Sequence, residues 1–400
     1  MSILGQMLND SYTKEEEKVV SIEEFSNAVM EYEELVTETM LDSNALISAE
    51  QFVNVASNYI ETIPSNISVE SLNVNTNVLC STLGISTEDV FEDNLSVESI
   101  GSFIVKVYES IKLLFKKIIN SIKKIVVKVM VILNGIGEKA KKLKKALKAG
   151  DKIAANSISE EEAKNFNKFY SAIAAIKNTS TFSGTLPIDL MNFYKSKVPE
   201  NLKKGITVID KMRDFITANT VIEGDAFNKL LTHLQREPIP KKIDYEYEDE
   251  AHTSVFAVSA IGTKVKMIEV HTNEYGIHLK IISASVEDEL DGDIKVMEKN
   301  KLIKLLDLIE SNAKGLKSYS NNRLSEINKL QKELDKLAEA KSTGRSIKKI
   351  VLKLKASVGT NSRALVAGAY LDSIVGYDKS IRKAYSFAKV NANYYNINEL

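Results

Sequence analysis

A short serine–glutamate motif occurs twice near the N-terminus and offers the clearest chemistry in the sequence. The two copies are Ser68-Val69-Glu70-Ser71-Leu72 and Ser96-Val97-Glu98-Ser99-Ile100. A protease pocket that holds a carboxylate discriminates strongly against chains that lack one, so each copy can serve as a cleavage site after its glutamate. The alternative interpretation is that each serine caps a helix with its glutamate nearby, and this fits the second copy well.

The second copy lies where the charge of the chain changes sign. Residues 1–100 contain 19 acidic side chains and two lysines, whereas residues 101–150 contain 13 lysines and two acidic side chains. Residues 151–400 carry 38 Lys/Arg against 33 Asp/Glu, so the three parts have net charges of −17, +11 and +5. A cut after Glu98 would remove −17 and leave a chain of +16. The near-neutral total therefore suggests a precursor that matures into a basic protein.

Other residue types that carry chemistry form no convincing site. Cys80 is the single cysteine, which excludes an intrachain disulfide and suits a reducing compartment. His271 and His278 flank a predicted turn, but two histidines without a cysteine framework are more often surface residues than metal ligands. The sequence contains no phosphate-binding loop, dinucleotide fingerprint or zinc-protease motif. We therefore expect a non-enzymatic protein with no catalytic residues, metal or cofactor.

Composition and periodicity predict a mainly α fold. Proline is rare, at five residues, and helix-forming residues are abundant. We expect six segments along the chain. The first three are an acidic helical segment (1–61), a Ser/Asn-rich linker with both motifs (62–98) and basic amphipathic helices (99–150). The last three are a helical region (151–250), a small three-stranded antiparallel β-meander (251–290) and C-terminal helices (291–400). Within the fourth segment, we expect loops near Ser183-Gly184 and Val198-Pro199.

The most regular pattern is a heptad seam in the basic segment. Apolar residues recur with alternating steps of four and three over about four heptads, which predicts a long helix. We expect it to span about 104–133 and to end at Asn134-Gly135-Ile136-Gly137, before a second short helix. The seam consists of Ile104, Tyr108, Ile111, Phe115, Ile118, Ile122, Ile125, Val129 and Ile132. The lysines of both helices fall off the apolar positions: Lys106, Lys112, Lys116, Lys117, Lys123, Lys124, Lys128, Lys141, Lys142, Lys144 and Lys145.

This basic helix admits three interpretations. It is a core helix with a solvated lysine face, a surface that binds nucleic-acid phosphates, or a helix that lies in a membrane interface. In the precursor we expect the seam to be covered, either by the N-terminal acidic helices or by helices from residues 151–235. If the acidic helices are the cover, their carboxylates also lie close to the lysines.

The order of these features resembles internal head proteins of large tailed bacteriophages. The resemblance covers about residues 1–150 and is carried by the acidic N-terminus, Leu95-Ser96-Val97-Glu98-Ser99-Ile100 and the Lys/aliphatic helix. In such proteins a prohead protease cuts after a glutamate that has a small or aliphatic residue two positions earlier. By position, Glu70 and Glu98 would precede the cuts, and Ser68 and Ser96 would fill the recognition position, with Ser71 or Ser99 as the new N-terminus.

The resemblance implies a non-enzymatic protein of the virion interior that resides in the host cytoplasm before assembly. Its expected partners are the prohead protease, capsid or core proteins, packaged duplex DNA bound without sequence preference, and further copies of itself. Two alternatives stay open. One is a membrane-active protein that places residues 104–133 on an anionic membrane, and the other is a cytosolic helical scaffold.

Overall fold

A computed structural model describes residues 30–46, 49, 97–152, 157–205, 207, 243–244, 254–273, 276–286, 290, 293–339 and 362–397. The labelled helices are α4 (Val97–Ala149), α5 (Glu160–Ile176), α6 (Leu186–Asn192), the π-helix η1 (Phe193–Lys197), α9 (Lys299–Glu339) and α11 (Ser362–Ala392). The strands are β1 (Asp151–Lys152), β2 (Ile243–Asp244), β3 (Ser254–Ile261), β4 (Lys264–Asn273), β5 (Gly276–Val286) and β6 (Tyr395–Asn396). Further helical segments span residues 30–46, called helix 30–46 below, and residues 198–205.

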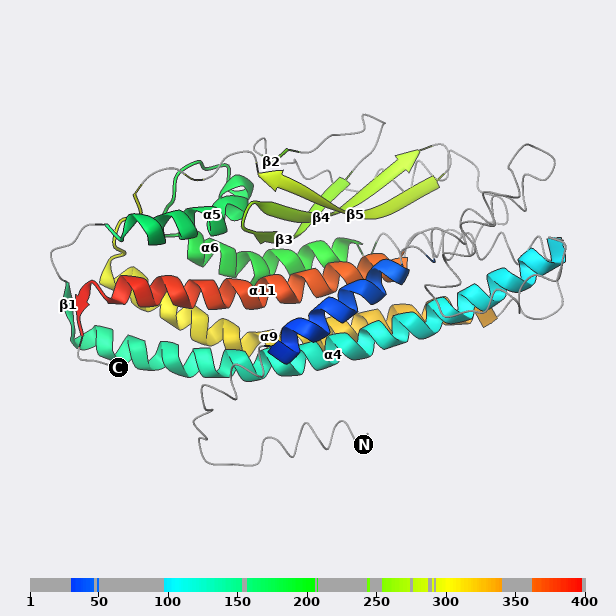
Figure 1. The fold of residues 1–400 in the computed structure, drawn as a ribbon, viewed down its shortest axis with the longest axis horizontal. Coiled ribbons are helices and arrows are strands. Elements are labelled where there is room, and N and C mark those ends of the chain that lie inside the picture. The colour runs from blue at the N-terminus through cyan, green and yellow to red at the C-terminus, as the bar shows by residue number, and fades with distance from the viewer. Residues whose placement is uncertain are drawn as a thin grey trace, which may run out of the picture.

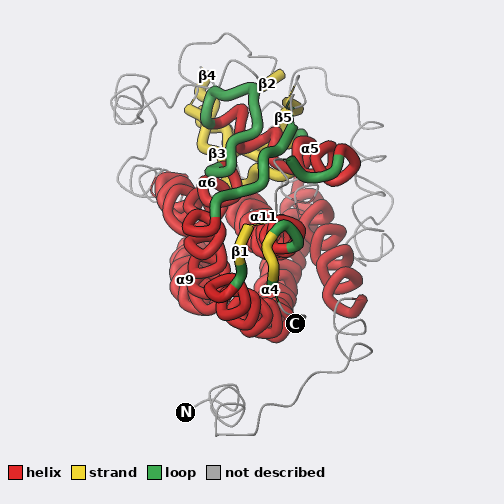
Figure 2. Tube along the Cα trace, turned by 90° about the vertical axis from the view of Figure 1, so that its left-hand side faces the viewer, coloured by secondary structure: helices red, strands yellow, loops and turns green. Residues whose placement is uncertain are grey.

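Three long helices form the body of the molecule. Helices α4, α9 and α11 pack against one another, and α11 also contacts β3, β4 and β5 (Figure 1). The sheet and the shorter helices α5 and α6 lie on one side of this bundle, as the view along it shows (Figure 2). α11 is therefore the element that joins the helical bundle to the sheet.

The sheet confirms the predicted antiparallel meander. β3 pairs with β4 and β4 with β5, both antiparallel, and Gly262 at φ +61° occupies the tight turn between Ile261 and Lys264. Glycine reaches this left-handed conformation without a Cβ clash. The two-residue strand β2 adds a fourth strand beside β5, and it is too short to leave a periodic signal in the sequence. The mainly α fold with a small antiparallel sheet in the C-terminal half is thus confirmed.

Helix α4 is longer than the sequence predicted. The expected end at Asn134–Gly137 is wrong, because one helix of 53 residues runs through both glycines to Ala149. The apolar stripe continues beyond them through Ile136, Ala140, Leu143 and Leu147, all buried. A glycine inside a helix costs about 1 kcal/mol, whereas burying one large aliphatic side chain contributes about 1.5–3 kcal/mol, so packing outweighs the local preference.

The seam of α4 lies in the core. Its described members Ile111, Phe115, Ile118, Ile122, Ile125, Val129 and Ile132 are at most 1% exposed. The side chains of Ile104 and Tyr108 lie outside the described residues, although both positions belong to α4. Among the described elements between Asp151 and Ala392, α9 and α11 make most of the contacts with α4, whereas α5 and α6 make few; residues 208–235 lie outside the described part of the chain.

Hydrogen bonds between buried polar groups hold α11 to its neighbours. The Tyr377 hydroxyl donates to Asn312 Oδ1 of α9 at 2.5 Å. Tyr194 of η1 stacks on Tyr377 with ring centroids 5.6 Å apart and shares a 3.1 Å hydrogen bond with Ser259 of β3. Because buried polar groups are costly when unpaired, these contacts fix the register of the helices against the sheet.

We predict that Phe115→Ala lowers the free energy of unfolding by about 3–5 kcal/mol, because it empties a buried site in the seam. The matched control is Leu113→Ala on the same helix, where the side chain is 67% exposed. We expect the control to change the stability by less than about 0.5 kcal/mol. Urea unfolding followed by far-UV circular dichroism measures both, and equal losses in the two variants would contradict the assignment of the seam to the core.

Candidate nucleic-acid interface

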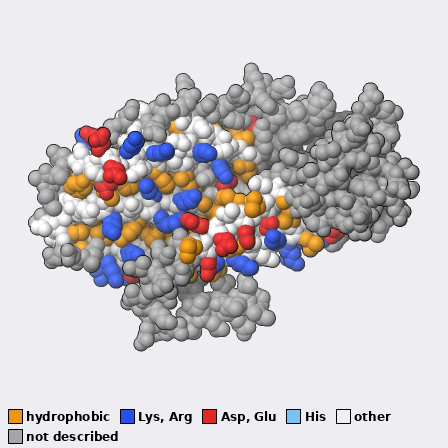
Figure 3. Space-filling view, in the orientation of Figure 1, with side chains coloured by type: hydrophobic (Ala, Val, Ile, Leu, Met, Phe, Trp, Pro, Cys, Tyr) orange, Lys and Arg blue, Asp and Glu red, His pale blue; other side chains and the backbone are white. Residues whose placement is uncertain are grey.

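The burial of the seam turns the lysines of α4 away from the core. Of the eleven lysines predicted to contact DNA or membrane, seven are exposed and four, Lys112, Lys123, Lys128 and Lys144, are half-buried. The exposed ones are Lys106, Lys116, Lys117, Lys124, Lys141, Lys142 and Lys145. Basic and acidic side chains lie interspersed on the face of the molecule shown in Figure 3. The positions available to phosphates are therefore set by which lysines already have a carboxylate partner.

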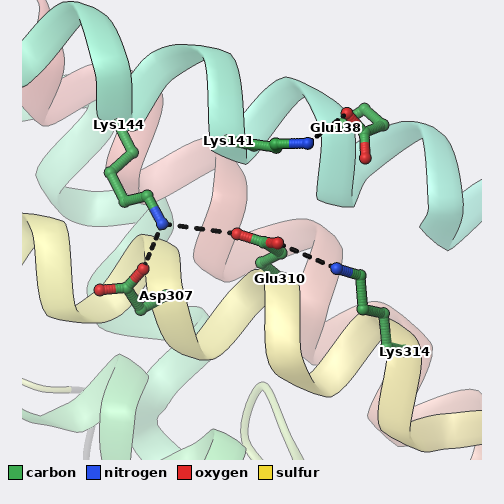
Figure 4. Close-up of polar contacts among 6 residues, drawn as sticks. All are labelled: Glu138, Lys141, Lys144, Asp307, Glu310 and Lys314. Atoms are coloured by element: carbon green, nitrogen blue, oxygen red, sulfur yellow. Dashed lines mark hydrogen bonds and ion pairs between the residues drawn. The ribbon is translucent and has the colours of Figure 1, made fainter.

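One lysine of α4 is committed to α9. Lys144 Nζ lies 2.5 Å from Asp307 Oδ1 and 3.5 Å from Glu310 Oε2, and Glu310 also binds Lys314 (Figure 4). The hydrogen bond that Lys144 donates to Asp307 is the main cause that raises the pKa of Lys144. Lys314 and then Lys144 lower the pKa of Glu310 against the effect of burial. This cluster joins the two helices, so Lys144 is a poor candidate for a phosphate contact.

Two lysines of α4 bind helix 30–46. Lys117 Nζ lies 2.9 Å from both carboxylate oxygens of Asp42, and Lys128 forms an ion pair with Glu31. Lys141 pairs within α4 with Glu138, at 3.7 Å. The expectation that acidic N-terminal carboxylates lie near the lysines therefore holds for these two lysines, and α9 and α11 also pack against α4.

The two cleavage motifs are described only in part. Glu98 and Ser99 lie in the first turn of α4, whereas Ser96 and the first copy, Ser68, Glu70 and Ser71, lie outside the described residues. The first turn of a helix has backbone N–H groups without intrahelical partners, and such ends open at little cost. The peptide bond after Glu98 is therefore at the one end of α4 where local unwinding does not disturb the seam.

Sequence reasoning expected acidic N-terminal carboxylates near the lysines but did not identify Glu31 and Asp42, and it missed the partners in α9. A signal for helix 30–46 was present, since Tyr32 and Val36 start a series with steps of four and three that continues through Thr39, Ser43 and Leu46. All five side chains are buried, but the polar threonine and serine interrupt the apolar pattern. The carboxylates of α9 had no such signal, because their pairing with Lys144 joins positions far apart in the chain.

Among the described residues, no helix is long and apolar enough to cross a membrane. Within the same residues, no group of three or more His, Cys, Asp or Glu side chains is arranged to hold a metal ion.

The comparison with known proteins rests on one family. No curated protein and no solved structure matches the chain. The family of phiKZ-like phage internal head proteins matches residues 13–390, a range that includes helix 30–46, α4, the sheet and nearly all of α11. The family implies a position inside the phage capsid, in association with capsid components. The chain therefore belongs to the phiKZ-like phage internal head proteins and is a structural protein of the head interior.

Proposed function

We propose that the chain is the precursor of an internal head protein and that a prohead protease removes its acidic N-terminal segment. The proposed cuts follow Glu70, Glu98 or both. One observation carries the proposal, namely that the second motif coincides with both the reversal of charge and the beginning of α4. A cut after Glu98 removes a net charge of −17, shortens α4 by its first two residues and leaves the later helices and strands uninterrupted.

The mature part is proposed to associate with packaged duplex DNA. Residues 99–400 carry a net charge of +16, and the lysines of α4 face away from the core. Lysines that neutralise phosphates release condensed counterions, which supplies affinity without sequence preference. While the acidic segment is attached, its opposite charge screens this field. Removal of the segment inside the closed head would then raise the affinity where the genome is packaged.

No observation favours the two alternative functions. A membrane-bound helix 104–133 would have to withdraw seven buried seam side chains from contact with α9 and α11. That step would expose this apolar seam to water before any contact with lipid is gained. A host-cell scaffold would not call for a reversal of charge at a repeated motif.

We predict that Glu98→Ala blocks removal of the segment that precedes α4, and that Glu98→Ala with Glu70→Ala blocks all processing. The reason is that a protease site built for a carboxylate is left with an unpaired polar group when the carboxylate is absent. The matched control is Glu61→Ala, because Glu61 has the bulky Tyr59 two positions earlier. The measurement is the gel mobility of the protein from infected cells. Normal processing of the double variant would contradict a cleavage role for the two motifs and favour their interpretation as helix caps.

We also predict that residues 99–400 bind duplex DNA far more tightly than residues 1–400 at low salt. Their log affinity should fall linearly with log salt, with a slope of about −0.9 per phosphate contact. Replacing the exposed lysines Lys116, Lys124, Lys142 and Lys145 with glutamine should make this slope shallower. Lys144→Gln is the control, since Lys144 is held by α9 and should leave the slope nearly unchanged. Equal affinity of the long and short chains in a mobility-shift assay would contradict screening by the acidic segment.

A further inference from the structure

Helix 30–46 packs as an amphipathic helix with a buried side and an acidic side. Tyr32 and Leu46 are 2% and 0% exposed, and Thr39 is fully buried with its hydroxyl bonded to the Leu35 carbonyl. Ala49, the next residue that the structure describes, is also fully buried. The exposed positions of helix 30–46 include Glu33, Glu34 and Glu38. The helix therefore contributes apolar contacts to the bundle and displays negative charge outward.

The ion pairs show how helix 30–46 lies on α4. Glu31 pairs with Lys128 and Asp42 pairs with Lys117, so the two helices run antiparallel. Eleven positions separate the two acids and also the two lysines, which is about three helical turns. Both acids and both lysines therefore recur on one side of their helices. The match in spacing makes the two ion pairs compatible with one straight contact.

Tyr32 joins the same helix to α11. The Arg382 guanidinium carbon lies 6.0 Å from the centre of the Tyr32 ring, and Arg382 Nη2 lies 2.5 Å from Asp378 Oδ2. Asp378 is fully buried, and burial raises its pKa while Arg382 opposes that rise. A cation above an aromatic face is attracted to the ring. Helix 30–46 is thus held by a cation–π contact with Arg382 of α11 and by two ion pairs with α4 (Figure 1).

We propose that α4 and α11 form a binding surface for an acidic amphipathic helix, and that helix 30–46 occupies it as a separable ligand. The inference rests on the proposed processing and deepens it. A cut after Glu70 or Glu98 breaks none of the contacts with Lys117, Lys128 or Arg382, because both sites lie outside helix 30–46. The cut N-terminal fragment therefore stays bound, and processing alone does not complete the reversal of charge.

Duplex DNA is the displacing agent in this proposal. DNA phosphates and the carboxylates of helix 30–46 compete for Lys117 and Lys128, so binding of one lowers the affinity for the other by the same factor. The cut contributes by ending the high effective concentration that the covalent connection provides. Entry of the genome then releases the acidic fragment, and the protein exchanges one polyanion for another.

The first experiment cuts the full-length protein without the phage protease. A site for a sequence-specific protease is inserted after residue 80, the protein is cut at physiological salt, and size-exclusion chromatography follows the two parts. We expect the N-terminal fragment to co-elute with residues 81–400 and to separate when duplex DNA is added. Separation of the wild-type fragment without DNA would overturn the proposal. Retention of the fragment before DNA is added needs neither natural processing nor DNA affinity, so it distinguishes failure of the inference from failure of the proposed function.

Substitutions in helix 30–46 and in α4 test where the proposed binding surface lies. Tyr32→Ala should speed loss of the cut fragment by about tenfold, whereas Tyr32→Phe, which keeps the ring under Arg382, should retain it. The matched control is Met30→Ala, two positions earlier and 59% exposed, which should behave as wild type. Asp42→Lys should also weaken retention, and adding Lys117→Asp should restore it by exchanging the charges. Equal retention of all variants would overturn the assignment, and circular dichroism before the cut confirms that each one is folded.

A second readout uses the uncut chain. Tyr32→Ala changes no charge, yet it should raise the affinity for duplex DNA several-fold because it frees Lys117 and Lys128 from their partners. Met30→Ala should leave that affinity unchanged. If the fragment is retained in the first experiment but Tyr32→Ala does not alter DNA binding, displacement by DNA is overturned and only the helix-binding surface stands.

Discussion

The structure depends on burial of one apolar seam. Helix α4 extends for 53 residues and exposes at most 1% of each described seam side chain from Ile111 to Ile132. α9 and α11 provide that burial, and Lys299 at the start of α9 donates to the carbonyls of Lys148 and Gly150 at the end of α4. A cation at a helix C-terminus also complements the helix dipole. Once the seam faces inward, every lysine between its positions must face outward or sideways.

That constraint determines how the charges of the protein interact. Some lysines of α4 reach neighbouring helices, as Lys144 reaches Asp307 and Lys117 reaches Asp42. Others, such as Lys116 and Lys124, are exposed and have no such ion pair among the described residues. The bundle thus holds some of its cations in structural pairs and leaves others for a polyanion. In the proposed function, the acidic N-terminus would compete with the genome for the same face, which would give a physical reason to make the protein with a removable acidic segment.

Local patterns in the sequence predicted the elements better than their partners. The steps of four and three identified α4, and alternation with a turn at Gly262 identified the meander, since both signals arise within single elements. The end of α4 was mispredicted because contacts with α9, beginning some 150 residues later, outweigh the two glycines. The loop expected at Val198-Pro199 is instead helical, where the π-helix η1 leads into residues 198–205. The buried face of helix 30–46 was not recognised from the sequence because the polar residues Thr39 and Ser43 occupy two of its buried positions.

The intact mass of the native protein from mature phage particles tests the central claim most directly. The account predicts a chain that begins at Ser99 or Ser71 and so lacks 19 or 14 of the 54 acidic side chains. Recovery of the whole 44.5 kDa chain from mature particles would contradict it.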